Sequence, residues 1–287
     1  MRTRELEFMR RRRSGGIISN ARDLDLDIPD QKMIGIGDFG AKMVNYSIGK
    51  ILFDVTFAVV ATKNETLLKS AAPQRIKVDD TLSEKSREIF SKLVAKLDLL
   101  IIFTDLEDEN ISTQIAELSK DVLTVAIIPE SAPNKEKFQN SVDTFIYIED
   151  KDIDLMFEVV HCITGLLSVD TMVGDYADLR SVLGNGGRGY IACYKATGET
   201  PVIDSVESAI NSMKGVLCSS KGILLCVFGY PERIYARNEA YMMLKEVAHP
   251  EAEIMGSVVV DISSDFVETI IIATNIELKG KQHNGKL

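Results

Sequence analysis

Short apolar runs alternate with amphipathic stretches along the first half of the chain. The runs are rich in β-branched residues and have the length of buried parallel strands, whereas apolar residues recur with helical spacing between them. This alternation predicts an α/β fold whose first lobe is a doubly wound parallel sheet with helices on both faces. The predicted strands are Met33–Ile36, Val55–Thr62, Leu99–Phe103, Val122–Ile128 and Val142–Ile148.

The spacing after residue 150 predicts a long central helix, from Asp152 to Ser168, with apolar residues on more than one side. We therefore expect it to lie between two lobes, with His161 as a packed or surface residue. An α+β second lobe follows. No helical pattern separates its last two strands, Ile254–Ile262 and Phe266–Asn275, so we expect these to form an antiparallel pair.

These patterns divide the chain into five parts. In the first lobe, Thr81–Glu84 reads as a capping box that opens a helix. We expect a disordered basic extension (1–30), a first α/β domain (31–151), the central helix (152–170), a second domain (171–280) and a short tail (281–287).

Composition excludes several classes of protein. The 287 residues carry a net charge of -10, which argues against general nucleic-acid binding by the folded part. No apolar run is long enough to span a bilayer, and no signal-peptide core follows the basic start. The four cysteines are widely spaced, which indicates reduced thiols in a cytoplasmic protein and no metal site.

A glycine-rich turn follows the first predicted strand. Gly35, Gly37 and Gly40 form a G-x-G-x-x-G pattern at the start of a helix, where free N–H groups and the helix dipole favour phosphate. With Asp38 and Asn45 they are the candidate cofactor-binding residues. The alternative is a tight turn that packs a helix on a sheet and binds nothing.

Several segments, in order, resemble the FtsZ/tubulin superfamily. Met33-Ile-Gly-Ile-Gly37 is similar to the family's V-I-G-V-G, and Asp175-Tyr-Ala-Asp-Leu-Arg-Ser-Val182 to its D-F-A-D-V-R-x-V. Ala196–Glu199 and Phe266–Asn275 also resemble family segments. The resemblance implies that residues 31–151 form a GTPase-like nucleotide-binding domain and residues 171–280 the second domain of the FtsZ/tubulin-like fold. It also implies that copies of the chain self-associate longitudinally.

In the resembled family a neighbouring subunit completes the GTPase site with two carboxylates. The resemblance assigns that catalytic role to Asp175 and Asp178. An alternative is purely structural, since Asp175 suits the N-cap of the following helix and Asp178 suits its first turn.

The family's glycine-rich phosphate loop is replaced by an acidic sequence. The loop after Leu99–Phe103 reads Thr104-Asp-Leu-Glu-Asp-Glu-Asn-Ile-Ser-Thr113, with four carboxylates and no glycine. Glycine is needed where backbone approaches a ligand closely, and carboxylates repel a triphosphate. We therefore expect GTP binding to be weak or lost and no cofactor to be required, with retained GTP binding as the alternative.

Three functional hypotheses follow. We favour a divergent FtsZ/tubulin-like cytoskeletal or assembly-scaffold protein over a slow, polymerising GTPase completed in trans by Asp175 and Asp178. In the third, the basic residues Arg10, Arg11, Arg12 and Arg13 contact an anionic partner or an acidic rim on this or a neighbouring molecule; the alternative is two unrelated solvated charge clusters. The expected rim residues are Asp38, Asp79, Asp80, Asp105, Glu107, Asp108 and Glu109.

Overall fold

The computed structural model describes residues 29–51, 55–79, 83–150, 152–167, 176–184, 186–230, 236–260 and 265–276. Residues 1–28 of the expected basic extension, the tail and Asp175 lie outside these ranges, so the sequence-based predictions for them remain predictions.

Strands and helices alternate through the first half of the chain, as the pattern predicts. In chain order they are β1 (Gln31–Ile36), α2 (Gly37–Ser47), β2 (Val55–Ala61), α3 (Asn64–Lys69), β3 (Gln74–Lys77), α4 (Glu84–Val94), β4 (Leu99–Phe103), α5 (Glu109–Leu118), β5 (Leu123–Pro129), α6 (Lys135–Gln139) and β6 (Thr144–Ile148). The second half contains α7 (Ile153–Leu166), α8 (Tyr176–Leu183), β7 (Gly187–Ala196), α9 (Pro201–Leu217), β8 (Ser220–Gly229), α10 (Arg237–Val247), β9 (Glu253–Val260) and β10 (Val267–Ile276).

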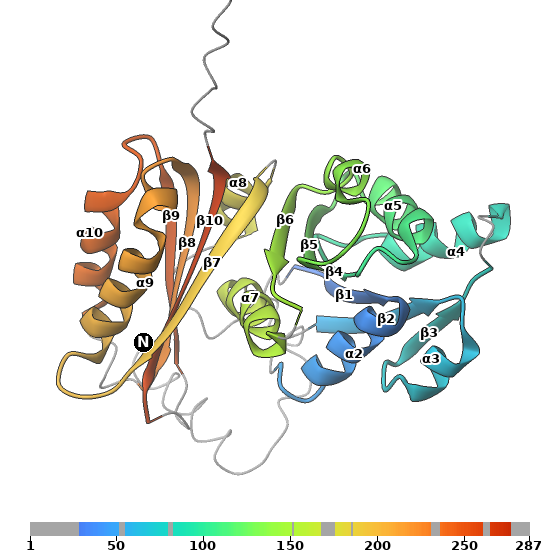
Figure 1. Cartoon of the computed structure of the whole chain (residues 1–287), viewed down its shortest axis with the longest axis horizontal. Helices are drawn as coiled ribbons and strands as arrows, with labels where there is room; N and C mark the ends of the chain where they lie inside the picture. Colours follow the sequence, from blue (N-terminus) through green and yellow to red (C-terminus); the bar gives the residue numbers. More distant parts are fainter. Residues whose placement is uncertain are drawn as a thin grey trace, which may run out of the picture.

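The ten strands of the described residues form one sheet that runs through both lobes (Figure 1). Its order is β3-β2-β1-β4-β5-β6-β7-β10-β8-β9. Strands β1 to β6 are parallel, and the start of β7 continues this parallel pairing with β6. The predicted α/β class and parallel first lobe are therefore confirmed, and the sheet continues across the domain boundary that we expect from the sequence.

Both faces of the first lobe are covered, because successive residues of a strand point to opposite sides. Ile34 and Ile36 of β1 contribute to the hydrophobic cluster under α4, α5 and α6. Met33, on the other face, belongs to the cluster that includes α2 and α7. This is the doubly wound arrangement that the sequence pattern predicts.

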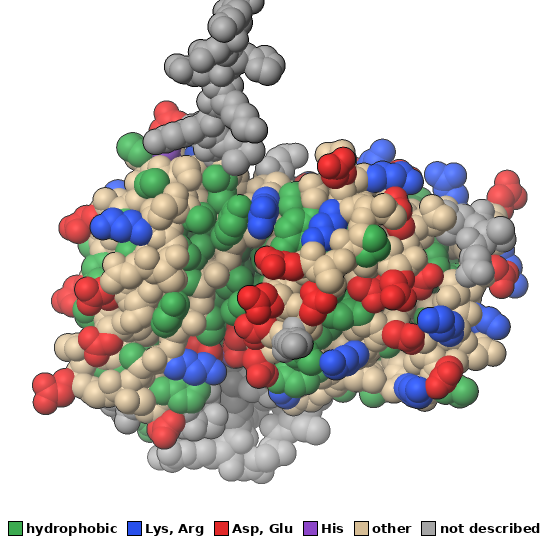
Figure 2. All heavy atoms as spheres, viewed as in Figure 1, with side chains coloured by type: hydrophobic (Ala, Val, Ile, Leu, Met, Phe, Trp, Pro, Cys, Tyr) green, Lys and Arg blue, Asp and Glu red, His purple; other side chains and the backbone are tan. Residues whose placement is uncertain are grey.

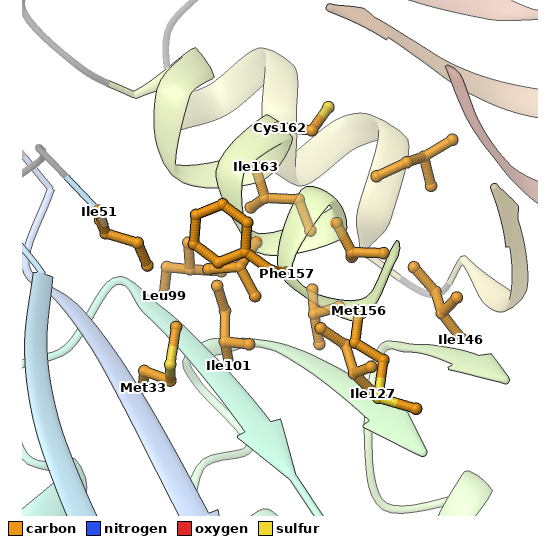
Figure 3. Packing of buried hydrophobic residues seen from close by; sticks show 14 of the residues in the cluster. Met33, Ile51, Leu99, Ile101, Ile127, Ile146, Met156, Phe157, Cys162 and Ile163 are labelled. Carbon is orange, nitrogen blue, oxygen red and sulfur yellow. The ribbon is translucent and has the colours of Figure 1, made fainter. Parts of the chain in front are cut away.

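The central helix α7 joins the two lobes into one core. Met156, Phe157 and Ile163 pack toward first-lobe strand residues such as Leu99, whereas Cys162 points away from those strands (Figure 3). The same hydrophobic cluster includes buried residues of β8 and β10 in the second lobe. The sandwiched position that the apolar pattern predicts is thus observed, and the lobes share buried packing.

The order of the second-lobe strands corrects one prediction. The strands predicted as Ile254–Ile262 and Phe266–Asn275, now β9 and β10, are not neighbours. Instead, β10 lies between β7 and β8 and is antiparallel to both, while β9 pairs in parallel with β8 at the edge. The helix α10 makes a crossover from β8 to β9, which places β9 outside β8 and leaves β10 between β7 and β8.

The start of α4 differs from the predicted capping box. The N-cap residue is Ser83, whose Oγ accepts a hydrogen bond from the backbone N of Ser86 at 3.2 Å. The helix therefore begins two residues later than a cap at Thr81 requires, and Thr81 itself lies outside the described residues.

Candidate functional site

The glycine turn joins β1 to α2 with no space for side chains at two of its three glycines. A Cβ on Gly35 would lie 2.2 Å from the carbonyl oxygen of Gly40, and a Cβ on Gly40 would lie 2.6 Å from that of Phe103. Gly37 has a φ of +69°, in the left-handed region that glycine favours. Packing of strand against helix alone therefore accounts for Gly35 and Gly40.

The acidic loop between β4 and α5 is hydrogen-bonded to itself. The backbone N–H of Leu106 donates to Thr104 Oγ1 at 3.0 Å, and that of Glu107 donates to Asp105 Oδ1 at 3.2 Å. Thr104 is fully buried and also bonds Ser112 of α5, with 2.8 Å between the hydroxyl oxygens. Two backbone donors of the loop are thus satisfied by side chains of the loop.

Two carboxylates of this loop face the glycine turn. Asp108 Oδ2 lies 3.3 Å, and Asp105 Oδ1 3.9 Å, from the position that a Cβ of Gly37 would occupy. Burial raises the pKa of Asp105, and the charges of Glu107 and Asp108 act in the same direction. A group of acidic side chains is visible between the positions of α2 and α5 (Figure 2). Negative charge therefore borders the turn where a phosphate would lie.

Asp38, the other acid of the turn, is paired with residues that follow β2. Its carboxylate accepts a hydrogen bond from Thr66 and forms an ion pair with Lys63 at 3.4 Å. The hydrogen bond from Thr66 and, to a smaller extent, the interaction with Lys63 lower the pKa of Asp38. The same interaction with Asp38 raises the pKa of Lys63. Asp38 is thus held as a carboxylate.

Asn45 lies on α2 and contacts the backbone around the end of α3. Its Nδ2 donates to the carbonyl of Lys69 at 3.0 Å, and its Oδ1 accepts from the backbone N of Ala71 at 2.7 Å. Asp38, Asn45, Lys63 and Lys69 line one open groove of about 410 Å³ beside α2. The side-chain amide of Asn45 thus connects α2 to the backbone that follows α3.

Asp178 lies at the opposite end of the first lobe from the glycine turn. The hydroxyl of Tyr176 on α8 donates to the carbonyl of Asp98, which precedes β4, and Arg180 contacts the carbonyl of Asp121, which precedes β5. Helix α8 is therefore at the amino ends of these strands, whereas Gly37 follows the carboxyl end of β1. Five residues of β4 separate the two ends by about 17 Å at ~3.3 Å per residue.

The side chain of Asp178 is exposed, and it lines a hollow of about 330 Å³ together with Tyr241 of α10 and Glu253 of β9. Asp175 lies outside the described residues. Within one chain the structure thus keeps the candidate catalytic carboxylate apart from the candidate phosphate-binding turn.

The predicted acidic rim is formed in part. Lys63 pairs with Asp38 at 3.4 Å, and the charges of Glu107 and Asp108 also act to raise the pKa of Lys63. Glu109 faces the other way, toward Lys137 at 3.8 Å. Asp80 and the four arginines lie outside the described residues, so the pairing of the basic segment with this rim remains a prediction.

Sequence reasoning missed three polar residues that shape the site. Thr66 holds Asp38, and Thr104 and Ser112 hold the acidic loop against α5. The signal for Thr104 was the buried strand immediately before it, because a hydroxyl that continues such a strand needs a local partner. No local pattern links Thr66 to Asp38.

Comparison with solved structures identifies the fold. The chain is similar to the FtsZ W319Y mutant of M. jannaschii, with a TM-score of 0.77 and 18% identity over 89% of this chain and 94% of that one. An empty FtsZ dimer from M. jannaschii matches with a TM-score of 0.76 and 18% identity over 90% and 93% of the two chains.

A second group of similar structures comes from Haloferax volcanii. CetZ2, in a GTPγS-bound protofilament, matches with a TM-score of 0.60 and 13% identity over 86% of this chain and 93% of that one. No protein-family model matches the chain. Among the described residues, no helix combines the length and apolar character needed to cross a membrane. From the sheet order, the central helix and these similarities, the chain has the FtsZ/tubulin fold.

Proposed function

We propose that this chain is a divergent FtsZ/tubulin-like cytoskeletal or assembly-scaffold protein that self-associates and whose GTP binding is weak or lost. The observation that carries the proposal is the self-bonded acidic loop against Gly37. Asp105 and Asp108 border the turn, and the backbone donors of Leu106 and Glu107 are bound by side chains of the same loop.

A triphosphate at this turn would meet two costs. The backbone N–H groups of the loop would have to exchange their hydrogen bonds with Thr104 and Asp105 for phosphate oxygens. Two unit charges of like sign 4 Å apart repel by about 1 kcal/mol in water and more at a partly buried site. Asp105 is half-buried, so its charge would be poorly screened.

The arrangement of the two ends supports head-to-tail association. The glycine turn is at the carboxyl ends of the first-lobe strands, and α8 is at their amino ends. Stacking of identical copies along the strand direction would place α8 of one copy near the turn of the next. An FtsZ dimer and a CetZ2 protofilament are among the structures to which the chain is similar.

Sedimentation velocity over a concentration series tests the proposal. We expect oligomers with and without GTP and Mg²⁺, because the contact surfaces do not need the nucleotide. Asp178→Lys should reduce assembly, since the residue is exposed at the α8 end. Glu207→Lys is a matched charge reversal on α9, on the outer side of the second lobe, and should leave assembly unchanged.

Two results would contradict this proposal. The first is a strict monomer at every concentration measured, and the second is assembly that requires GTP. Equal weakening by Asp178→Lys and Glu207→Lys would show that assembly responds to net charge and does not use the α8 end.

The second candidate is a slow GTPase completed in trans. The observation that favours it is the position of Asp178, which head-to-tail stacking would bring to the glycine turn of the next copy. Calorimetry with GTP and GDP, each with Mg²⁺, should show no saturable heat if binding is lost. Saturable binding, with phosphate release that falls in Asp178→Asn, would instead establish the GTPase.

A further inference from the structure

A second polar cluster lies between the central helix and the sheet of the second lobe. Glu158 and His161 come from α7, Glu268 from β10 and Lys195 from β7. One ligand atom from each of Glu158, His161 and Glu268 can be chosen so that all three lie within 4.8 Å of one another. None of these residues belongs to the glycine turn or its acidic loop.

Secondary structure places these groups on facing surfaces. Glu158-Val-Val-His161 is an i, i+3 pair, which lies on one face of a helix. Glu268 stands directly opposite Lys195 of β7 and Phe228 of β8, so these three side chains share one face of the sheet. The contact of 4.0 Å between Lys195 Nζ and Glu158 Oε1 shows that this face meets α7.

Packing restricts the candidate ligands. The imidazole ring of His161 is stacked on Phe228 at 4.2 Å and on Phe157 at 5.6 Å between ring centroids. Only 13%, 23% and 7% of the side-chain surfaces of Glu158, His161 and Glu268 are exposed. The cluster is therefore held by the core and has a partly open side at His161.

A thiol also orients one carboxylate. The Sγ–H of Cys193 donates a hydrogen bond to Glu268 Oε1 at 3.2 Å. Hydrogen bonds of this kind orient carboxylates that bind metals.

The two carboxylates of the cluster carry more negative charge than its one ammonium group compensates. Two largely buried carboxylates share one ammonium group, with Lys195 Nζ at 3.0 Å from Glu268 and 4.0 Å from Glu158. Buried carboxylates require compensation by a cation or a metal. Half of the Lys195 side chain is exposed, so the ammonium group can move into solvent when another cation takes its place.

The distance between the helix ligands fits a metal. His161 Nδ1 lies 3.4 Å from Glu158 Oε2, longer than a typical N–H···O bond. Two ligand atoms on a tetrahedral zinc ion, with bonds of about 2.0–2.1 Å, are about 3.4 Å apart. An imidazole beside carboxylates favours a transition metal over Mg²⁺ or Ca²⁺.

We propose that Glu158, His161 and Glu268 form a binding site for one divalent transition-metal ion, with Zn²⁺ as the probe. The ion takes the place of Lys195 as the counter-charge and links α7 to β10, with its remaining coordination position toward the partly exposed side at His161. Glu-x-x-His pairs on helices serve as metal ligands in carboxylate-rich bundles.

Zinc titration of the full-length, tag-free chain tests the proposal. After chelator treatment and dialysis, we expect one equivalent of Zn²⁺ to bind and to raise the thermal midpoint. His161→Ala and Glu268→Gln should each weaken binding by about tenfold or more, because each removes a direct ligand. His249→Ala, at a histidine whose Nδ1 accepts from the backbone N of Glu251, is the matched control and should bind as wild type.

Lys195→Met separates a metal site from a structural ion pair. Without metal, the substitution should lower the thermal midpoint, because the ion pair is lost. The variant should bind Zn²⁺ at least as tightly as wild type does, because no ammonium group competes with the ion. Far-UV circular dichroism checks that each variant folds, and Glu158→Gln replaces any variant that does not. Substoichiometric binding by wild type, or equal binding by wild type, His161→Ala and Glu268→Gln, would overturn the proposal.

Discussion

Replacing Phe228 with alanine is expected to lower the free energy of unfolding by about 3–5 kcal/mol, the range for a phenylalanine removed from a core. Phe228 is 3% exposed and belongs to the hydrophobic cluster that extends from the first lobe through α7 to the second. Its ring also packs against His161 of α7. Urea denaturation followed by circular dichroism would measure the loss.

The same experiment tests whether the lobes unfold together. Because the cluster is shared, one cooperative transition should shift as a whole. Leu68→Ala removes an apolar side chain that is 80% exposed, and it should change the free energy by less than about 0.5 kcal/mol. Two resolved transitions, only one of them shifted by Phe228→Ala, would show that the lobes have separate cores.

Gly40→Ala is expected to lower the free energy of unfolding by about 1–3 kcal/mol, the range for overpacking, despite the better helix propensity of alanine. The new Cβ would lie 2.5 Å from the carbonyl carbon of Gly35 and 2.6 Å from the carbonyl oxygen of Phe103. These are backbone atoms, so relief requires β1, β4 and α2 to move apart. Denaturation of the purified variant measures the effect.

Gly215→Ala is the control for the change of residue type. Gly215 lies in α9, and apart from its own helix backbone no atom of the described residues lies within 4 Å of an added Cβ. The substitution should leave stability unchanged or raise it by up to about 1 kcal/mol. Equal effects of the two substitutions would contradict the steric explanation. A Gly40→Ala variant as stable as wild type would contradict it as well.

Long elements with strong patterns could be predicted from the sequence. Leu99–Phe103 is observed with the predicted bounds, because five consecutive β-branched or large apolar residues are typical of a parallel strand that is buried on both faces. The helix α7 is observed within two residues of its predicted ends. In contrast, α6 and β3 were not predicted, since α6 buries only Phe138 and β3 buries none of its four residues.

The candidate site could be predicted only in outline. The G-x-G-x-x-G spacing located the turn. The acidic loop was recognised because it has carboxylates where the resembled family has a glycine-rich loop. The sequence could not show that Thr104 and Asp105 bind the loop's own backbone, or that Thr66 holds Asp38. These contacts depend on side-chain directions, which are set by the packing of neighbouring elements.

By itself, the sequence determined the alternation of elements and the parallel first lobe, because hydrophobic periodicity and turn residues act over short distances along the chain. The order of its motifs also carried the FtsZ/tubulin resemblance. Only the tertiary structure decided that β10 enters between β7 and β8, and that Glu268 meets Glu158 and His161. Strand order and ligand clusters depend on contacts between residues far apart in the chain. The turn at Gly35–Gly40 depends on both levels. Its glycine spacing is visible in the sequence, whereas the position of the carboxylates that border it is visible only in the tertiary structure.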